Sequence, residues 1–313
     1  MDDYKKNRKI EVLPVLAMGC LFLVVYGLVL LLTKPFVEQG GVTPAFEDVN
    51  DPMNILYIIV VMLAMTLVIL LIAKYWKEKV IQFIILGAIG YTSFFAFFLP
   101  IFSIVLPLSL SWVILFLSVT AAIVLVIVLY KYPEWYVIDV SGIIVGVGAI
   151  VIFGISLGVF LVVVLLVVLA VYDALSVYKT RHMIDLADTV MDLKLPVLLV
   201  VPKIRHYSLL RETKRLKEKL EEKEERDAFF MGLGDIVMPG ILVSAVYYNV
   251  PNGLPIALSV ILGTLVGFSV LMVFVMKGRP QAGLPLLCGG AIAGYIVSSL
   301  IFFGKLSGLV FPF

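Results

Sequence analysis

Long runs of apolar residues, separated by short polar clusters, make up most of the chain. Leu13–Thr33 and Met53–Ala73 are each 21 residues long, and a helix needs about 20 apolar residues to cross the hydrocarbon core of a bilayer. Four basic residues precede the first run, as in a signal peptide, but the run is too long for one and no small-residue cleavage site follows it. The pattern therefore predicts a retained first helix and a second helix of the same kind.

Two longer runs each have room for a pair of helices. Residues 80–130 contain no charged residue, and Pro100 and Pro107 predict the turn between their two helices because proline interrupts the helical hydrogen-bond ladder. Residues 137–178 divide in the same way at the glycine-containing segment 154–158. These runs supply spans three to six.

The C-terminal part of the chain supplies three more spans. Residues 228–276 divide at the Asn, Pro and Gly residues of 249–253, and Gln281–Gly304 is the last span. The sequence thus predicts an all-α polytopic membrane protein with nine transmembrane helices. Its parts are residues 1–178 with spans one to six, the polar segment 179–227, and residues 228–313 with spans seven to nine.

The composition excludes a water-soluble domain. Hydrophobic residues make up 62% of the 313 residues and charged residues only 15%, whereas soluble domains are near half apolar and a quarter charged. The expected surrounding is membrane lipid. The net charge of +2 gives no reason to expect a nucleic-acid partner. His182 and His206 stand apart and both cysteines lie in apolar runs, so no zinc spacing is present and neither a metal nor another cofactor is expected.

The basic residues predict the orientation. When the loops are assigned to alternate sides of the membrane, 22 of the 24 Lys and Arg residues fall on the side of the N-terminus, and only Lys34 and Lys305 fall on the other. Cytoplasmic loops carry the positive excess. We therefore expect the N-terminus and the 179–227 loop, with its charge-rich part Ser208–Asp227, in the cytoplasm and the C-terminus outside.

Three carboxylates lie within the predicted spans, where ionisable groups are costly and are therefore candidates for function. Asp139 stands at the start of span five and fits an interfacial residue or a structural hydrogen bonder. Asp173 lies five residues before the end of span six at Tyr178, and Asp235 lies about six residues after the start of span seven near Phe229. At about 1.5 Å per residue, both are roughly 8 to 9 Å from the cytoplasmic ends of their spans.

Two acids at one depth on neighbouring antiparallel helices suggest a catalytic pair. Close carboxylates do not both ionise, so the pair holds one proton. The ionised Asp takes a proton from water, the water attacks an amide carbon, and the protonated Asp donates to the carbonyl oxygen, as in aspartic proteases. The alternatives are two unrelated structural acids, or a proton- or sodium-coupled transporter, whose acids usually lie at the midplane between paired repeats.

Unusual residues flank the two acids and mark a third position on the same membrane face. They are Tyr172 before Asp173 in span six; Gly232, Leu233 and Gly234 before Asp235 in span seven; and Pro285, Leu286 and Leu287 at the head of span nine. A lone Gly-x-Gly-Asp also fits tight helix packing. The three elements together therefore indicate a functional site, which none of them indicates alone.

In these motifs the chain resembles the presenilin and signal-peptide-peptidase family of intramembrane aspartyl proteases, in its compact microbial form. The family pattern is Tyr-Asp in span six, Gly-x-Gly-Asp in span seven and Pro-Ala-Leu in span nine; the chain departs from it at Leu286, where the family has Ala. A prepilin-peptidase-like protease also uses Gly-x-Gly-Asp, but the Pro285 motif argues against it.

The resemblance implies a nine-helix presenilin-like fold and an aspartic-type endopeptidase with Asp173 and Asp235 as catalytic residues. It also implies that Tyr172 and the glycine motif shape the site, and that Pro285–Leu287 binds substrate. The implied substrates are single membrane helices with their N-termini outside. Presenilins work with partner subunits; for this compact chain, action as a single subunit and a homo-oligomer both stay open.

One apolar stretch in the polar segment is too short to span the membrane. Pro196–Pro202 places five mostly β-branched residues between prolines, which favours a strand over a helix. A substrate helix must unwind before cleavage, and its freed backbone groups then need partners. We expect Leu199 and Val200 to offer a strand edge to unwound substrate beside the Pro285 loop. The alternative is a buried segment that packs the loop onto the helices.

Overall fold

The computed structural model describes residues 2–75, 78–177, 198–202, 228–276 and 281–310. Its α-helices are α1 (Asp2–Glu38), α2 (Met53–Tyr75), α3 (Glu78–Ser93), α4 (Leu99–Val105), α5 (Ser111–Lys131), α6 (Trp135–Ser156), α7 (Val159–Leu175), α10 (Leu233–Asn249), α11 (Leu254–Met276) and α12 (Gly283–Phe303). A π-helical turn, η1 (Phe94–Phe98), joins α3 to α4, and a 3-10 turn, η2 (Leu108–Leu110), precedes α5. The two strands are β1 (Leu198–Pro202) and β2 (Ala228–Gly232).

The nine predicted spans correspond to nine helical segments in the described part of the chain. α3, η1 and α4 run on without a break and count as one segment. Six of the nine are long and apolar enough to cross a membrane by length and composition, whereas α7 is a shorter apolar helix. The predicted breaks at 154–158 and 249–253 are confirmed, because α6 ends at Ser156 and α10 ends at Asn249.

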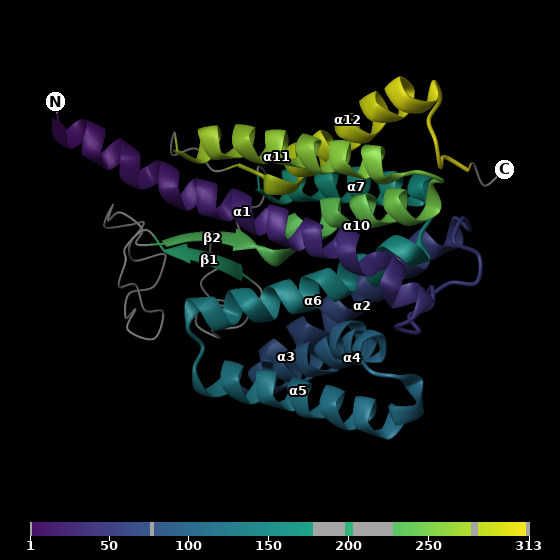
Figure 1. Cartoon of the computed structure of the whole chain (residues 1–313). Coiled ribbons are helices and arrows are strands. Elements are labelled where there is room, and N and C mark those ends of the chain that lie inside the picture. The colour runs from purple at the N-terminus through teal and green to yellow at the C-terminus, as the bar shows by residue number, and fades with distance from the viewer. Residues whose placement is uncertain (1, 76–77, 178–197, 203–227, 277–280, 311–313) are drawn as a thin grey trace.

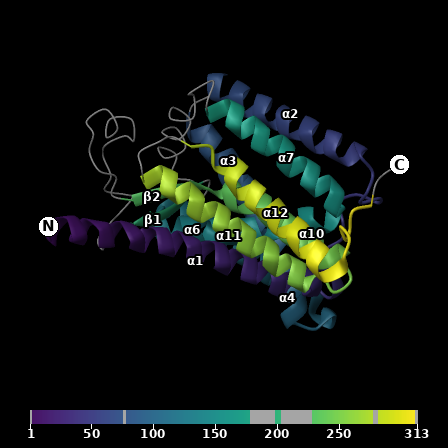
Figure 2. The same ribbon diagram turned by 90° about the horizontal axis from the view of Figure 1, so that it is seen from above.

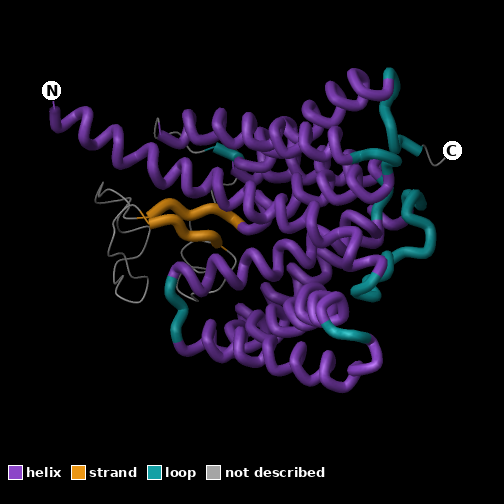
Figure 3. The backbone as a smooth tube through the Cα atoms, in the orientation of Figure 1, coloured by secondary structure: helices purple, strands orange, loops and turns teal. Residues whose placement is uncertain are grey.

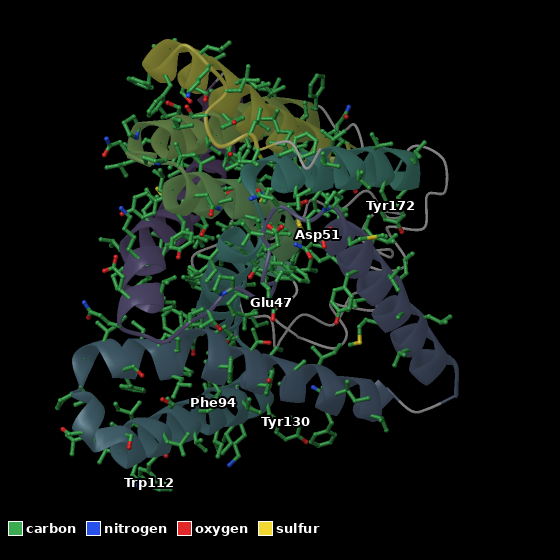
Figure 4. The ribbon with its side chains drawn as sticks, turned by 90° about the vertical axis from the view of Figure 1, so that its right-hand side faces the viewer. Glu47, Asp51, Phe94, Trp112, Tyr130 and Tyr172 are labelled. Carbon is green, nitrogen blue, oxygen red and sulfur yellow. The ribbon has the colours of Figure 1, made fainter. Side chains whose placement is uncertain are left out.

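The longer helices are tilted relative to one another (Figure 2), and the two ends of the bundle seen in Figure 1 differ. The N-terminus and the two strands lie at one end, and the C-terminus lies at the other. Figure 4 looks onto the end opposite the strands, where Glu47 and Asp51 lie on the loop before α2. The start of α10 therefore shares an end of the molecule with the N-terminus.

The turn that we expected at Pro100 and Pro107 forms only at the second proline. The helix continues through Pro100 and ends at Val105. The π turn explains this result: the Leu99 amide donates to the carbonyl of Phe94, five residues back, and this wider turn leaves room for the proline ring, which would clash with the carbonyl four residues back in a regular helix.

The start of span seven was also predicted wrongly. Ala228–Gly232 is a strand, not the first turn of a helix, and it pairs antiparallel with β1 in the register Leu199↔Met231, Val200↔Phe230 and Val201↔Phe229. This pairing gives partners to backbone groups that would otherwise be left unsatisfied at the end of the bundle. α10 begins only at Leu233. The orange pair of Figure 3 leads directly into this helix.

Most of the polar segment is not described. Its expected helical extension, Lys179–Leu195, and its charge-rich part, Ser208–Asp227, lie outside the described residues. The described piece, β1, is buried among the helices: Leu199 and Val200 are 1% and 2% exposed. The segment 179–227 is therefore more than a solvated loop.

The hydrophobic core extends over α1, α6, α7, α10, α11 and α12. Seen from above, α11 and α12 lie between α1 and α7 (Figure 2). The two helices approach so closely that a Cβ at Gly263 would overlap the carbonyl oxygen of Gly290, and one at Gly267 would overlap that of Leu286. These glycines fix the position of α12, which begins at the candidate site described next.

Candidate active site

Asp173 lies at the end of α7 and contacts the start of α12. It is the third residue from the end of α7 and is 6% exposed. The Leu284 amide donates to its Oδ2 at 3.1 Å, and the Gly283 amide adds a second backbone interaction. The first amides of a helix have no partner within that helix, and they favour a negative group. The Asp173 carboxylate therefore occupies the amino end of α12.

Asp235 is the third residue of α10, whose N-cap is Gly232. Its carboxylate interacts with the Gly232 backbone amide, as an acid does at the third position of a capping box. The sequence Gly-Leu-Gly-Asp thus places the acid in the first turn because the helix starts directly after Gly232. The antiparallel pair β1–β2, called the hairpin below, leads through β2 directly into α10 and so to Asp235.

The start of α12 brings the two acids into one site. A methyl group at position 283 would lie 3.2 Å from both carboxylate oxygens of Asp235, while the amides of Gly283 and Leu284 engage Asp173. Asp173 and Asp235 also interact electrostatically with each other. Asp173 is the third residue from the end of α7, which continues as a π-helical turn over residues 176–177, and Asp235 is the third residue of α10. Both acids therefore lie near helix ends, and Asp235 is closer to the start of its helix than the predicted six residues.

The remaining residues of the glycine motif have different surroundings. The Leu233 side chain packs against α6, where it would contact methyl groups at Gly142 and Gly146 at 3.6 and 3.4 Å. Gly234 is exposed, and a Cβ there would meet no atom within 4 Å. Gly234 therefore does not serve the close packing of two described helices.

The residues expected to bind substrate at α12 are only partly accessible. Pro285 and Leu286 are half-buried, and the backbone of Leu286 lies against Gly267. Leu287 is 0% exposed and belongs to the core, so its side chain does not face a surface that a substrate could reach. Tyr172, in contrast, is 67% exposed on α7 (labelled in Figure 4).

The strand predicted around Leu199 and Val200 forms, but its outward amide is already used. The Val200 amide donates to Asp139 Oδ1 at 2.8 Å. Asp139, on α6, is therefore a structural hydrogen bonder, one of the two roles expected for it. Because neighbouring residues of a strand direct their backbone groups to opposite edges, Leu199 and Val201 face β2 and Val200 faces α6. At Val200, β1 has no free donor for a substrate.

Three residues near the acids were missed in the sequence. Gly283 and Leu284 act through their backbone, which a sequence motif does not reveal. Tyr26, fully buried on α1, donates its hydroxyl to the carbonyl of Ile236 at 2.9 Å and so braces the turn that carries Asp235. A tyrosine inside an apolar span indicates a buried hydrogen bond, but a partner 210 residues away is not predictable from that signal.

Comparison with known proteins agrees with this geometry. No match was found among curated protein sequences. The family model described as "Signal-peptide peptidase, presenilin aspartyl protease" matches residues 19–304. Two solved structures of a presenilin family intramembrane aspartate protease, in space groups C222 and P2, are each 34% identical in sequence and cover 92% of this chain. The C222 structure is covered to 99% with a TM-score of 0.65, and the P2 structure to 98% with a TM-score of 0.66.

These matches cover nearly the whole chain, including all three motifs, and they set aside the transporter alternative. The fold is presenilin-like and the activity is that of an aspartic-type endopeptidase of the membrane. The chain belongs to the signal-peptide peptidase and presenilin family of intramembrane aspartyl proteases.

Proposed function

We propose that this protein hydrolyses peptide bonds within the transmembrane helices of other proteins, with Asp173 and Asp235 as the catalytic pair. The observation that carries the proposal is the arrangement at the start of α12. Its first two amides engage Asp173, and Gly283 lies against both carboxylate oxygens of Asp235. One helix terminus therefore positions two acids from two other helices.

The chemistry follows from two neighbouring carboxyls that share one proton. The ionised carboxylate removes a proton from water, and the water oxygen attacks the carbonyl carbon of the substrate amide. The protonated carboxyl donates to the carbonyl oxygen. The tetrahedral intermediate then breaks its C–N bond, and the amine leaves with a proton from the pair. This step requires no cofactor.

Substrate unwinding is the second requirement, and the hairpin beside the site supports a way to meet it. Val200 directs its amide to α6, so its partner Phe230 directs its own backbone groups away from β1. Within the described residues the sheet has two strands, and the outer edge of β2 has no further strand beside it. We place the unwound substrate on this edge. Leu199 and Val201 hold β2 from the other side, and Val200 holds β1 to α6.

The flanking residues then have roles around this edge. β2 ends at Gly232, three residues before Asp235, so a strand paired with β2 runs toward the catalytic carboxyls. Gly234 leaves open space beside Asp235. The half-buried Pro285 and Leu286 and the exposed Tyr172 lie at the ends of the two helices that frame Asp173.

We further propose that the N-terminus and the 179–227 segment are cytoplasmic and the C-terminus is outside. The distribution of Lys and Arg supports this orientation, with 22 of 24 on one side. The positions of the N-terminus and the strands at one end of the bundle fit the same assignment (Figure 1).

The test is cleavage of a defined helix by the purified chain. The protein, in detergent with added lipid, is incubated with a single-span substrate, and the fragments are identified by mass spectrometry. We expect a cut inside the apolar span, made by the chain without a partner subunit. Glu47→Gln, which changes an exposed acid at the far end of the bundle, should cleave like the wild type. Cuts only in the polar flanks, or none, would overturn the proposal.

A further inference from the structure

Asp139 is a buried acid that the proposed reaction does not use. It is 6% exposed on α6, and a carboxylate inside a span is costly. Its Oδ1 accepts the Val200 amide at 2.8 Å. This bond joins α6 to the middle residue of β1, 61 positions later in the chain.

Asp139 is part of a face of α6 that receives the hairpin and the start of α10. Asp139, Gly142 and Gly146 are spaced three and four residues apart, so they lie on one side of the helix. A methyl group at Gly142 would lie 3.0 Å from the Leu199 side chain. Leu233 packs over Gly142 and Gly146 together. Asp139 thus holds the backbone of β1. Gly142 and Gly146 leave room on α6 for the side chains of Leu199, from β1, and Leu233, the first residue of α10.

The hairpin transmits this position to the catalytic carboxyl. Val200 pairs with Phe230, β2 continues without a loop into α10, and Asp235 is the third residue of that helix. A shift of β1 along α6 would therefore move β2 and the first turn of α10. It would also move the outer edge of β2 relative to both acids.

We propose that Asp139 is a positioning residue for the proteolysis, which sets the register of the β1–β2 hairpin against α6 and thereby the place of Asp235 and of the substrate strand. This inference rests on the proposed function. It predicts that Asp139 governs which bond is cut as well as how fast. A residue needed only for packing would change the yield of folded protein and leave the cleavage position as it is.

The test compares Asp139→Asn, which keeps an oxygen acceptor for Val200, with Asp139→Val, which has none. Asp139→Val should lower kcat for a helical substrate about 10-fold, as expected for a displacement of about 0.5 Å, and should spread the cuts over neighbouring bonds in the mass spectrum. Asp139→Asn should keep the wild-type cleavage position and most of kcat. Ser141→Ala removes a buried hydroxyl that bonds within α6, to Val137, and should change neither.

A second readout does not depend on cleavage. Hydrogen exchange of peptides covering 198–202 and 228–232 should be at least about 10-fold faster in Asp139→Val than in Asp139→Asn or wild type, because local opening exposes the amides. Unchanged exchange in a folded Asp139→Val protein would overturn the inference. So would a wild-type cleavage position in that variant. If wild type itself fails to cut while the exchange result holds, the proposed function fails and the anchoring of the hairpin by Asp139 stands.

Discussion

Substitution of Gly283 by alanine tests how closely α12 is fitted to the acids. The added methyl group would lie 3.2 Å from each carboxylate oxygen of Asp235. Ordinary van der Waals contacts of a Cβ atom begin near 3.4 Å, so the carboxyl must move by about 0.2 to 0.4 Å. Since a misplacement of about 1 Å near reacting groups costs about 100-fold in rate, the same scale gives a loss of about 3- to 6-fold.

The loss should appear in kcat with little change in KM, because the methyl group disturbs a carboxyl that acts in the transition state. The assay measures initial rates of cleavage of a single-span substrate at several substrate concentrations. Gly289→Ala on the same helix is the matched control, since a Cβ there meets no atom within 4 Å. Wild-type kcat in Gly283→Ala, or an equal loss in Gly289→Ala, would refute the reasoning.

Three further predictions follow from the site and the orientation. Gly234→Leu should lose most activity without loss of folded protein, because its side chain would occupy the open space beside Asp235; a matching fall in folded protein would restore a packing role. The cleavage rate should be highest at mildly acidic or neutral pH and should fall in alkali, when the pair loses its shared proton; a rate that still rises in strong alkali would require another base. A tag after Phe313 should be accessible from outside and one within Ser208–Asp227 only from the cytoplasm; protease protection of both tags on one side would break the nine-span assignment.

The spans were predictable because their signal is local. Each is a run of apolar residues of membrane-spanning length, and that requirement does not depend on what the helix packs against. Pro100 shows the limit of this reasoning. Its effect on the helix depends on the preceding π turn, Phe94–Phe98, and nothing in the apolar pattern distinguishes a π turn from a regular one.

The end of span seven nearest the site was not predictable for a different reason. The sequence of Ala228–Gly232 is apolar and would also fit the first turn of a transmembrane helix. It forms a strand because β1 lies beside it and pairs with it. That pairing joins residues separated by the undescribed segment 203–227. Strand formation here is a property of two distant segments together, and strand preference is known to depend on such context.

The catalytic pair could be proposed from the sequence because intramembrane acids are rare, but its surroundings could not. Asp173 and Asp235 are conspicuous among apolar neighbours. Gly283 is one glycine among 24 in the chain, and only the three-dimensional approach of α12 to both acids reveals its place. The same holds for Asp139, whose partner is a backbone amide that any residue at position 200 except proline would supply.

The most direct test of the central claim is a double-mutant comparison of the two acids. Asp173→Asn, Asp235→Asn and the double variant are purified, shown to be folded, and assayed for cleavage of the same single-span substrate. If the carboxyls act as one unit, each single variant loses nearly all cleavage and the double variant is little worse than either. A single variant that keeps most of its activity, or losses that multiply in the double variant, would contradict catalysis by a shared-proton pair.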